Sequence, residues 1–392
     1  MRNEAGSVSD LTESALIARI SGRLPPAPSW IAVGIGDDAA VVEPERNRLE
    51  VLSVDALVEG VHFDRAFTPP AAIGHRALAV NLSDLAAMGA TPRLALLSLA
   101  LPPSLLLADF DEMTASLIAL AARFRIAIVG GNLTRIDGPL VIDVTVLGTV
   151  KRRQFLTRGG ARSGDDLYVS GTVGSAAAGL QMLKSTVDSQ QSTVNSRQST
   201  VDSRQSTVDG ARSTADGRPA TEDRRLATDD WRLPTADWRL PTDDWRLATD
   251  DRLVRRYLYP EPRVRLGSLL GRNRAATACI DLSDGLAEGV HQLAKASSIG
   301  ATIDAAALPI DADARRWFEQ RATDAVHEAI TGGDDYELLI AVRPRVRGRV
   351  AAAERHGGTP LTRIGSCTTG RAVVLRQNGA DRPLPRGYSH FR

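Results

Sequence analysis

The chain contains very little cysteine, and this shortage excludes two classes of protein. Cys279 and Cys367 are the only two cysteines in 392 residues. They are too few for a disulfide framework, and their spacing matches no cysteine-based metal site. Cys279 lies in an apolar run, so we expect it to be a small core residue.

The chain also lacks a strong net charge and any long hydrophobic run. Its formal charge of +1 gives no general attraction to nucleic acid or to an anionic membrane. The most apolar stretch, Leu94 to Leu107, is interrupted by Pro102-Pro103 and is too short to span a bilayer. The polar start, Met1 to Glu4, leads into no apolar signal segment. We therefore expect a cytoplasmic protein without membrane segments.

A Walker A sequence is absent as well. Gly34, Gly36 and Ala39 superficially match a dinucleotide-binding fingerprint. Asp37 and Asp38 argue against that interpretation, because two carboxylates inside the loop would repel a bare pyrophosphate. With metal ions bound, the same acids would attract one.

The length of 392 residues suggests two or more domains. Strand-like and helix-like segments alternate, which is typical of an α/β or α+β protein. Apolar residues at spacings of three and four predict a helix that ends near Phe124, with Ser104 as its cap. We expect further helices at 11–20, 71–88, 175–184, 263–270 and 286–298, and strands at 49–54, 94–101, 126–129, 141–150, 277–281 and 336–342.

We assign residues 1–150 to an N-terminal domain and residues 151–392 to a C-terminal α/β domain. A low-complexity insertion at 185–251 interrupts the second domain and repeats in sevens. A coiled coil does not fit, because its first half has one valine per repeat and part of its second half contains proline. We expect this insertion to be disordered. The alternative is an interaction arm, since three tryptophans each precede an arginine: Trp231, Trp238 and Trp245.

Aspartates flanked by glycine recur at 34–40, 281–285 and 332–336. Two carboxylates about 4 Å apart repel by roughly 4 kcal/mol at an effective dielectric of about 20. A bound cation removes that cost, and Mg²⁺ usually bridges a few carboxylates to substrate phosphates. Glycine lets the backbone approach closely. The alternative is that these pairs are ordinary turn residues.

Two more acids belong to this pattern. The strand at 49–54 delivers Asp55 at its end, and His62 follows shortly after it. Asp84 lies between Leu82 and Leu85 in the helix at 71–88, so it is either a partly buried carboxylate that needs partners or a solvent-facing helical residue.

Several segments together resemble the thiamine-monophosphate kinase family, within the superfamily of aminoimidazole ribonucleotide synthetase-like ATP enzymes. The resemblance covers the chain outside the insertion. It is carried by GIGDDAAVV, SVDALVEGVHF, ALAVNLSDLAAMGA, TRGGARSGDDLYVSG, CIDLSDGLAEGVHQLAKAS and TGGDDYELL.

The resemblance implies a two-domain protein that forms a homodimer through its N-terminal domains. It also implies ATP-dependent and Mg²⁺-dependent phosphorylation of thiamine monophosphate, with Asp55, Asp84 and Arg158 as the catalytic residues. The positions that match metal ligands are Asp38, Ser53, Asp55, Asp84, Asn132, Asp281 and Asp284. Those that match ATP contacts are Gly131 and Asn132 in a turn, Arg158 and Ser283, and those that match substrate contacts are His62 and Asp334.

The chain departs from the family pattern at several positions. Asn132 and Leu133 replace the usual Asp and Thr, and Asp334 replaces the usual Glu. Pro385 stands near a position that often holds an aromatic residue, with Tyr388 as a candidate substitute. Because no residue stands out as a nucleophile, we expect direct in-line phosphoryl transfer. Two alternatives are another ATP-using enzyme of the superfamily and a nucleotide-binding module with weakened catalysis.

Overall fold

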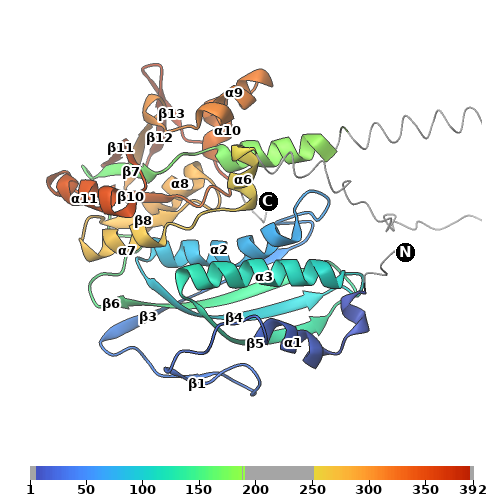
Figure 1. Cartoon of the computed structure of the whole chain (residues 1–392). Coiled ribbons are helices and arrows are strands. Elements are labelled where there is room, and N and C mark those ends of the chain that lie inside the picture. Colours follow the sequence, from blue (N-terminus) through green and yellow to red (C-terminus); the bar gives the residue numbers. More distant parts are fainter. Residues whose placement is uncertain (1–5, 188, 190–250, 389–392) are drawn as a thin grey trace, which may run out of the picture.

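The computed structural model describes residues 6–187, 189 and 251–388, and these form two α/β units (Figure 1). The N-terminal unit is built on a four-stranded sheet in the order β3-β6-β4-β5. Its strands are β3 (Arg48–Val58), β4 (Thr91–Leu101), β5 (Ala127–Arg135) and β6 (Val141–Lys151). β4 and β5 run parallel, and the other neighbours run antiparallel.

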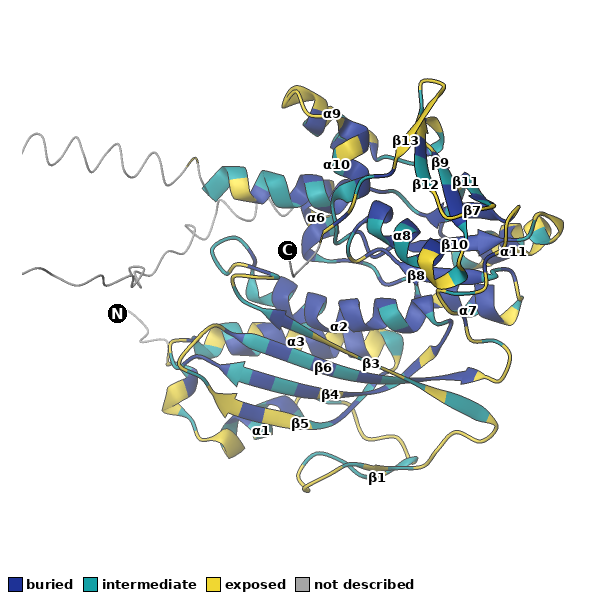
Figure 2. Cartoon of the chain, turned by 180° about the vertical axis from the view of Figure 1, so that it is seen from behind, coloured by how far each residue is buried: buried dark blue, intermediate teal, exposed yellow. Residues whose placement is uncertain are grey.

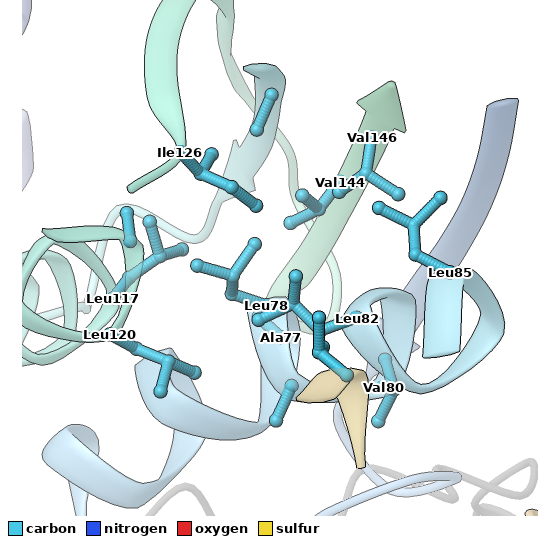
Figure 3. Close-up of a cluster of buried hydrophobic side chains, with 14 of the residues drawn as sticks. Ala77, Leu78, Val80, Leu82, Leu85, Leu117, Leu120, Ile126, Val144 and Val146 are labelled. Atoms are coloured by element: carbon cyan, nitrogen blue, oxygen red, sulfur yellow. The ribbon is translucent and has the colours of Figure 1, made fainter. Parts of the chain in front are cut away.

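Helices α2 (Pro70–Ala87) and α3 (Leu107–Phe124) cover one face of this sheet (Figure 1). The apolar side chains of α2 pack against α3, for example against Leu117, and against the inner side chains of β6, such as Val144 and Val146 (Figure 3). The opposite side of α2 contacts α7 and β8 of the C-terminal unit. Because α2 is enclosed on two sides, its sequence is apolar nearly all round and lacks a narrow hydrophobic stripe.

The chain before β3 forms a short 3₁₀ turn, η1 (Val8–Asp10), and helix α1 (Glu13–Ser21). The Thr12 side chain caps α1 by accepting from the backbone N–H of Ala15. Strands β1 (Ile31–Val33) and β2 (Val41–Val42) then form a small antiparallel pair. The glycine and aspartate segment at 34–40 is the loop between them.

The C-terminal unit holds a seven-stranded sheet in the order β13-β12-β9-β11-β7-β10-β8. Its strands are β7 (Asp166–Ser170), β8 (Ala278–Asp281), β9 (Gly300–Asp304), β10 (Leu338–Val342), β11 (Leu361–Thr368), β12 (Val373–Gln377) and β13 (Ala380–Pro383). Its helices are one at 175–187, α6 (Arg252–Leu258), α7 (Val264–Arg272), α8 (Leu286–Ser297), η2 (Ala305–Ala307), α9 (Ala312–Gln320), α10 (Ala325–Thr331), η3 (Pro344–Val346) and α11 (Arg347–Gly357).

The mixed α/β two-domain prediction is confirmed, and most expected elements occur near their expected bounds. Three local predictions were wrong. Asp55 lies inside β3, because β3 pairs with β6 up to Val58. Gly131 and Asn132 lie inside β5 and form no turn. A Cβ atom on Gly131 would lie 1.9 Å from the Leu97 carbonyl oxygen, so glycine is needed for this close pairing of β4 and β5. Ser104 does not cap α3, which begins after Leu106.

Most of the predicted insertion at 185–251 lies outside the described residues. Its two described flanks pack against each other, since a Cβ atom on Gly179 would lie 2.2 Å from the Leu253 carbonyl oxygen. Among the described residues, no helix is long and apolar enough to cross a membrane.

Candidate active site

A cavity of about 1100 Å³ lies between the two units, and it collects most of the predicted site residues. Asp55 comes from β3, Asp84 from α2, and Asp281 from the end of β8. The other predicted residues that line it are His62, Arg158, Ser283, Asp284 and Asp334. Residues far apart in sequence therefore meet in one place.

Three aspartates form an anionic cluster in this cavity. The hydroxyl of Ser53 donates to Asp84, and that of Ser83 donates to Asp281 Oδ2 at 2.8 Å. Burial and the charge of Asp84 raise the pKa of Asp281 to about 7, against a smaller lowering by the Ser83 hydrogen bond and by Arg158. The packing around Asp55 and the charges of Asp84 and Asp281 raise its pKa to about 7 as well. The positive charge that the protein places near these carboxylates is therefore too small to offset their burial and mutual repulsion.

The donor set of this cluster suits a hard divalent cation, which takes oxygen ligands. Within the described residues, no three His, Cys, Asp or Glu side chains converge closely enough to enclose an ion by themselves. Mg²⁺ does not require such a cage, since it usually keeps several waters and uses one or two carboxylates together with substrate phosphates. The mutual repulsion of the three aspartates therefore fits the binding of a cation whose coordination shell is completed by a substrate phosphate.

The two downstream loops with glycine and aspartate pack backbone to backbone at the wall of the cavity. The Asp334 N–H donates to the Ser283 carbonyl at 2.8 Å, and the Tyr336 N–H donates to the Leu282 carbonyl at 3.0 Å. A Cβ atom on Gly333 would lie 2.5 Å from the Ser283 oxygen. Glycine at this position lets the loop at 332–336 lie directly on the loop at 281–285.

Three further side chains line the cavity. His62 Nδ1 accepts from the Val58 N–H at 3.0 Å, so a neutral ring carries its proton on Nε2. Arg158 is exposed, and its guanidinium makes no hydrogen bond to the described residues. Tyr388 lies at the wall because its N–H donates to the Asp284 carbonyl at 3.2 Å. The rest of the terminal motif, 389–392, lies outside the described residues.

The structure separates three predicted residues from this cavity. Asp38, Gly131 and Asn132 line a second pocket of about 520 Å³, beside α1 and the outer strand β5. Asn132 stands at the same level of the sheet as Ser98, Asp143 and Ala56. It is on the opposite face from Asp55, which neighbours Ala56 on β3. Three strand spacings of about 4.8 Å separate β3 from β5, or about 14 Å.

Sequence reasoning missed Arg76, Tyr257 and Tyr336 as residues of the cavity wall. Arg76 carried a readable signal, because an arginine inside an alanine-rich and leucine-rich helix must find partners once the helix is buried. Tyr257 had no such signal, because its neighbour Arg76 comes from a distant segment. Tyr336 lies inside the segment at 332–336, and its hydroxyl donates to Asp334, two residues earlier.

Comparison with known proteins gives a consistent result for both units of the chain. Residues 36–150 match the family model of the AIR synthase related protein, N-terminal domain, and residues 241–377 match that of its C-terminal domain. The thiamine-monophosphate kinase of Escherichia coli K12 is 34% identical, over 97% of this chain and 98% of that protein.

Two solved structures are similar over nearly their full length. The crystal structure of thiamine-monophosphate kinase from Stenotrophomonas maltophilia has 36% identity and a TM-score of 0.69, covering 94% of this chain and 98% of that one. A structure of AaThiL complexed with AMPPCP and TMP has 27% identity and a TM-score of 0.64, covering 98% of both chains.

Proposed function

The chain belongs to the thiamine-monophosphate kinases of the AIR synthase-related family, and we propose that the cavity containing Asp55, Asp84 and Asp281 is its active site. The reaction is the ATP-dependent phosphorylation of thiamine monophosphate to thiamine diphosphate. The observation that supports this site is the cluster of three acids whose charges repel one another inside a cavity between the two units.

The transfer breaks the bond between the γ-phosphorus of ATP and the ADP oxygen, and it forms a bond to a phosphate oxygen of thiamine monophosphate. Both described cysteines are buried, and burial raises the thiol pKa of each. We therefore propose direct in-line transfer, in which the protein positions two phosphates and stabilises the charge of the transferred group.

Mg²⁺ would be held by Asp55, Asp84 and Asp281, with Ser53 and Asp284 beside them, and when bound it neutralises the phosphate charges. Arg158 and Ser283 line the same cavity as Asp281, and Arg158 is close enough to lower the pKa of Asp281, so we assign both to the ATP phosphates. Arg158 is a suitable partner because its planar guanidinium binds phosphate oxygens in pairs.

We assign His62, Asp334 and Tyr388 to the thiamine moiety. All three line the same cavity as the acids. Tyr388 supplies an aromatic ring at the cavity wall, and its side chain is 50% exposed. The family pattern often has an aromatic residue near the position where Pro385 stands in this chain. We propose that Tyr388 replaces it and stacks on the substrate.

We further propose a homodimer formed by the uncovered face of the four-stranded sheet, which Figure 2 shows in front of α2 and α3. The apolar side chains of Leu52, Val54 and Leu96 project from this face and are 66%, 55% and 39% exposed. A solvent-facing sheet normally alternates apolar and polar residues, so an apolar outer face indicates a protein interface. A second copy supplies a complementary apolar surface.

The dimer also accounts for Asp38, Gly131 and Asn132, which lie outside the cavity that contains Asp55. Asp55 and Asn132 occupy opposite edges and opposite faces of one sheet, too far apart to ligate the same ion. In a two-fold symmetric pair, the β5 edge of one copy can face the β3 edge of the other. We propose that Asp38, Gly131 and Asn132 of one copy complete the active site of its partner.

The function is tested directly by a coupled assay for ADP with ATP, Mg²⁺ and thiamine monophosphate. We expect ADP formation that depends on thiamine monophosphate, with thiamine diphosphate as the second product identified by chromatography. A folded protein, verified by circular dichroism, that forms no thiamine diphosphate would contradict the assignment.

Binding of Mg²⁺ alone should depend on pH in a defined direction. The raised pKa values of Asp55 and Asp281 mean that, between about pH 4 and pH 7, the folded protein binds protons that the unfolded chain does not. Without Mg²⁺, this part of the stability is present at low pH and is lost as the pH rises through about 7. Mg²⁺ competes with those protons, so it should raise the melting temperature more at pH 8 than at pH 5.5.

At about ten times its Kd, Mg²⁺ should contribute about 1.4 kcal/mol at pH 8. The measurement is differential scanning fluorimetry with and without MgCl₂ at the two pH values. Asp55→Asn should reduce the Mg²⁺ effect, whereas Asp381→Asn, on the exposed edge strand β13, should not. An equal Mg²⁺ effect at both pH values, or one unchanged in Asp55→Asn, would remove the metal ion from this cluster.

A further inference from the structure

Arg76 is a fully buried cation at the junction of the two units. Its side chain is 1% exposed, and it comes from α2 of the N-terminal unit. Nη2 donates to Asp334 Oδ1 at 3.0 Å, Nη1 donates to the Tyr257 carbonyl, and the guanidinium lies 4.4 Å from the centre of the Tyr257 ring. Burial alone would lower the pKa of Arg76, but the Asp334 carboxylate holds it above its ordinary value. A buried charge of this kind is tolerated only with its partner in place.

Asp334 is held on its other side by Tyr336. The Tyr336 hydroxyl donates to the same oxygen, Oδ1, at 3.1 Å. Both residues have left-handed backbones, with φ of 68° at Asp334 and 49° at Tyr336. Non-glycine residues adopt this conformation at an energetic cost, so other contacts must maintain it. One such contact is the bond from the Asp334 N–H to the Ser283 carbonyl.

The two oxygens of Asp334 therefore differ. Oδ1 accepts from two fixed donors, while Oδ2 makes no hydrogen bond to the described residues although Asp334 lines the cavity. An oriented and unpartnered carboxylate oxygen is suited to accept a hydrogen bond from a ligand. The amino group on the pyrimidine ring of thiamine monophosphate is a donor of that type.

We propose that Arg76 and Tyr336 are positioning residues that fix Asp334 so that Oδ2 binds the amino group of thiamine monophosphate. This inference rests on the proposed function. Arg76 neutralises the carboxylate and joins α2 to the loop at 332–336, and Tyr336 sets the rotation of the carboxylate. Both act on substrate affinity through Asp334 and do not touch the transferred phosphoryl group.

Tyr336→Phe tests this inference with the smallest change, because it removes one hydroxyl from a buried ring. We expect the KM for thiamine monophosphate to rise about tenfold, which corresponds to about 1.4 kcal/mol. We expect kcat, the KM for ATP and the melting temperature to stay close to wild type. Arg76→Met should raise the same KM further, and Arg76→Lys should recover part of the loss, since lysine keeps the charge but not the planar pair of donors.

A double-mutant cycle separates positioning from a general structural effect. The cycle is run in an Arg76→Met background, where Asp334→Asn leaves no buried cation unpaired. If Tyr336 acts through Asp334, adding Tyr336→Phe to Asp334→Asn should raise the KM for thiamine monophosphate little beyond Asp334→Asn alone. Additive effects, equal rises in both KM values, or no change in Tyr336→Phe would overturn the inference. Wild-type protein that forms no thiamine diphosphate in the same assay would instead show that the proposed function has failed.

Discussion

Replacing Asp55 with asparagine should lower kcat by about 10²–10³-fold or more, the usual cost of removing one preorganised electrostatic group from a transition state. Asparagine keeps the size of the side chain and its place on β3, where the Asp55 N–H donates to Asn81 Oδ1 at 3.0 Å. It removes the charge that belongs to the cluster with Asp84 and Asp281. The measurement is steady-state ADP formation with saturating ATP, Mg²⁺ and thiamine monophosphate.

The same substitution should not destabilise the protein, and this separates a catalytic loss from misfolding. Without Mg²⁺, the Asp55 charge is unfavourable, as its raised pKa shows. Asp55→Asn should therefore melt at the wild-type temperature or slightly above it in metal-free buffer. Asp381→Asn is the matched control, since its exposed ion pair with Arg376 contributes little. An active Asp55→Asn enzyme would exclude Asp55 from the reaction.

Placing a charge on the uncovered sheet face should abolish both the dimer and the activity. Leu52→Glu introduces a carboxylate at the most exposed of the large apolar residues that the structure describes, which is 66% exposed. In a monomer that side chain faces water, so the fold should tolerate glutamate. In a dimer it would be buried without a partner, which costs several kcal/mol. Light scattering should report a monomer, and ADP formation should fall at least about 100-fold if the partner completes each site.

A mixing experiment distinguishes a shared site from two independent ones. Asp38→Ala and Asp55→Asn should each be inactive alone. If Asp38 serves the partner's cavity, a heterodimer of the two variants retains one intact site out of two. Random assembly at equal amounts then gives about one quarter of the wild-type activity, since about half of the two-fold dimers are mixed. Coexpression followed by the ADP assay measures this. No recovery from two inactive variants would show that Asp38 and Asp55 act in the same chain, or that Asp38 acts elsewhere.

Local sequence was sufficient for much of the fold. The spacing of apolar residues from Leu107 to Phe124 predicted α3, because the buried face of an amphipathic helix carries an apolar residue every three or four positions. Helix α2 was predicted from its composition and its end at Gly89, whose φ is +67°. Strand ends were less predictable. Asp55 and Asn132 continue their strands because neighbouring strands still pair with them, and this pairing is a long-range property.

The sequence by itself determined that acidic residues flanked by glycine recur, that no Walker A loop accompanies them, and to which family the chain is similar. It also contains no residue that stands out as a nucleophile. Only the tertiary structure decided that Asp55, Asp84 and Asp281 share one cavity, whereas Asp38 and Asn132 face another. It also showed that Arg76 of α2 holds Asp334 of the other unit. The physical reason is that periodicity along a chain specifies which face of an element is buried, but not which other element buries it. The charges and hydrogen bonds of a site depend on which elements pack against each other.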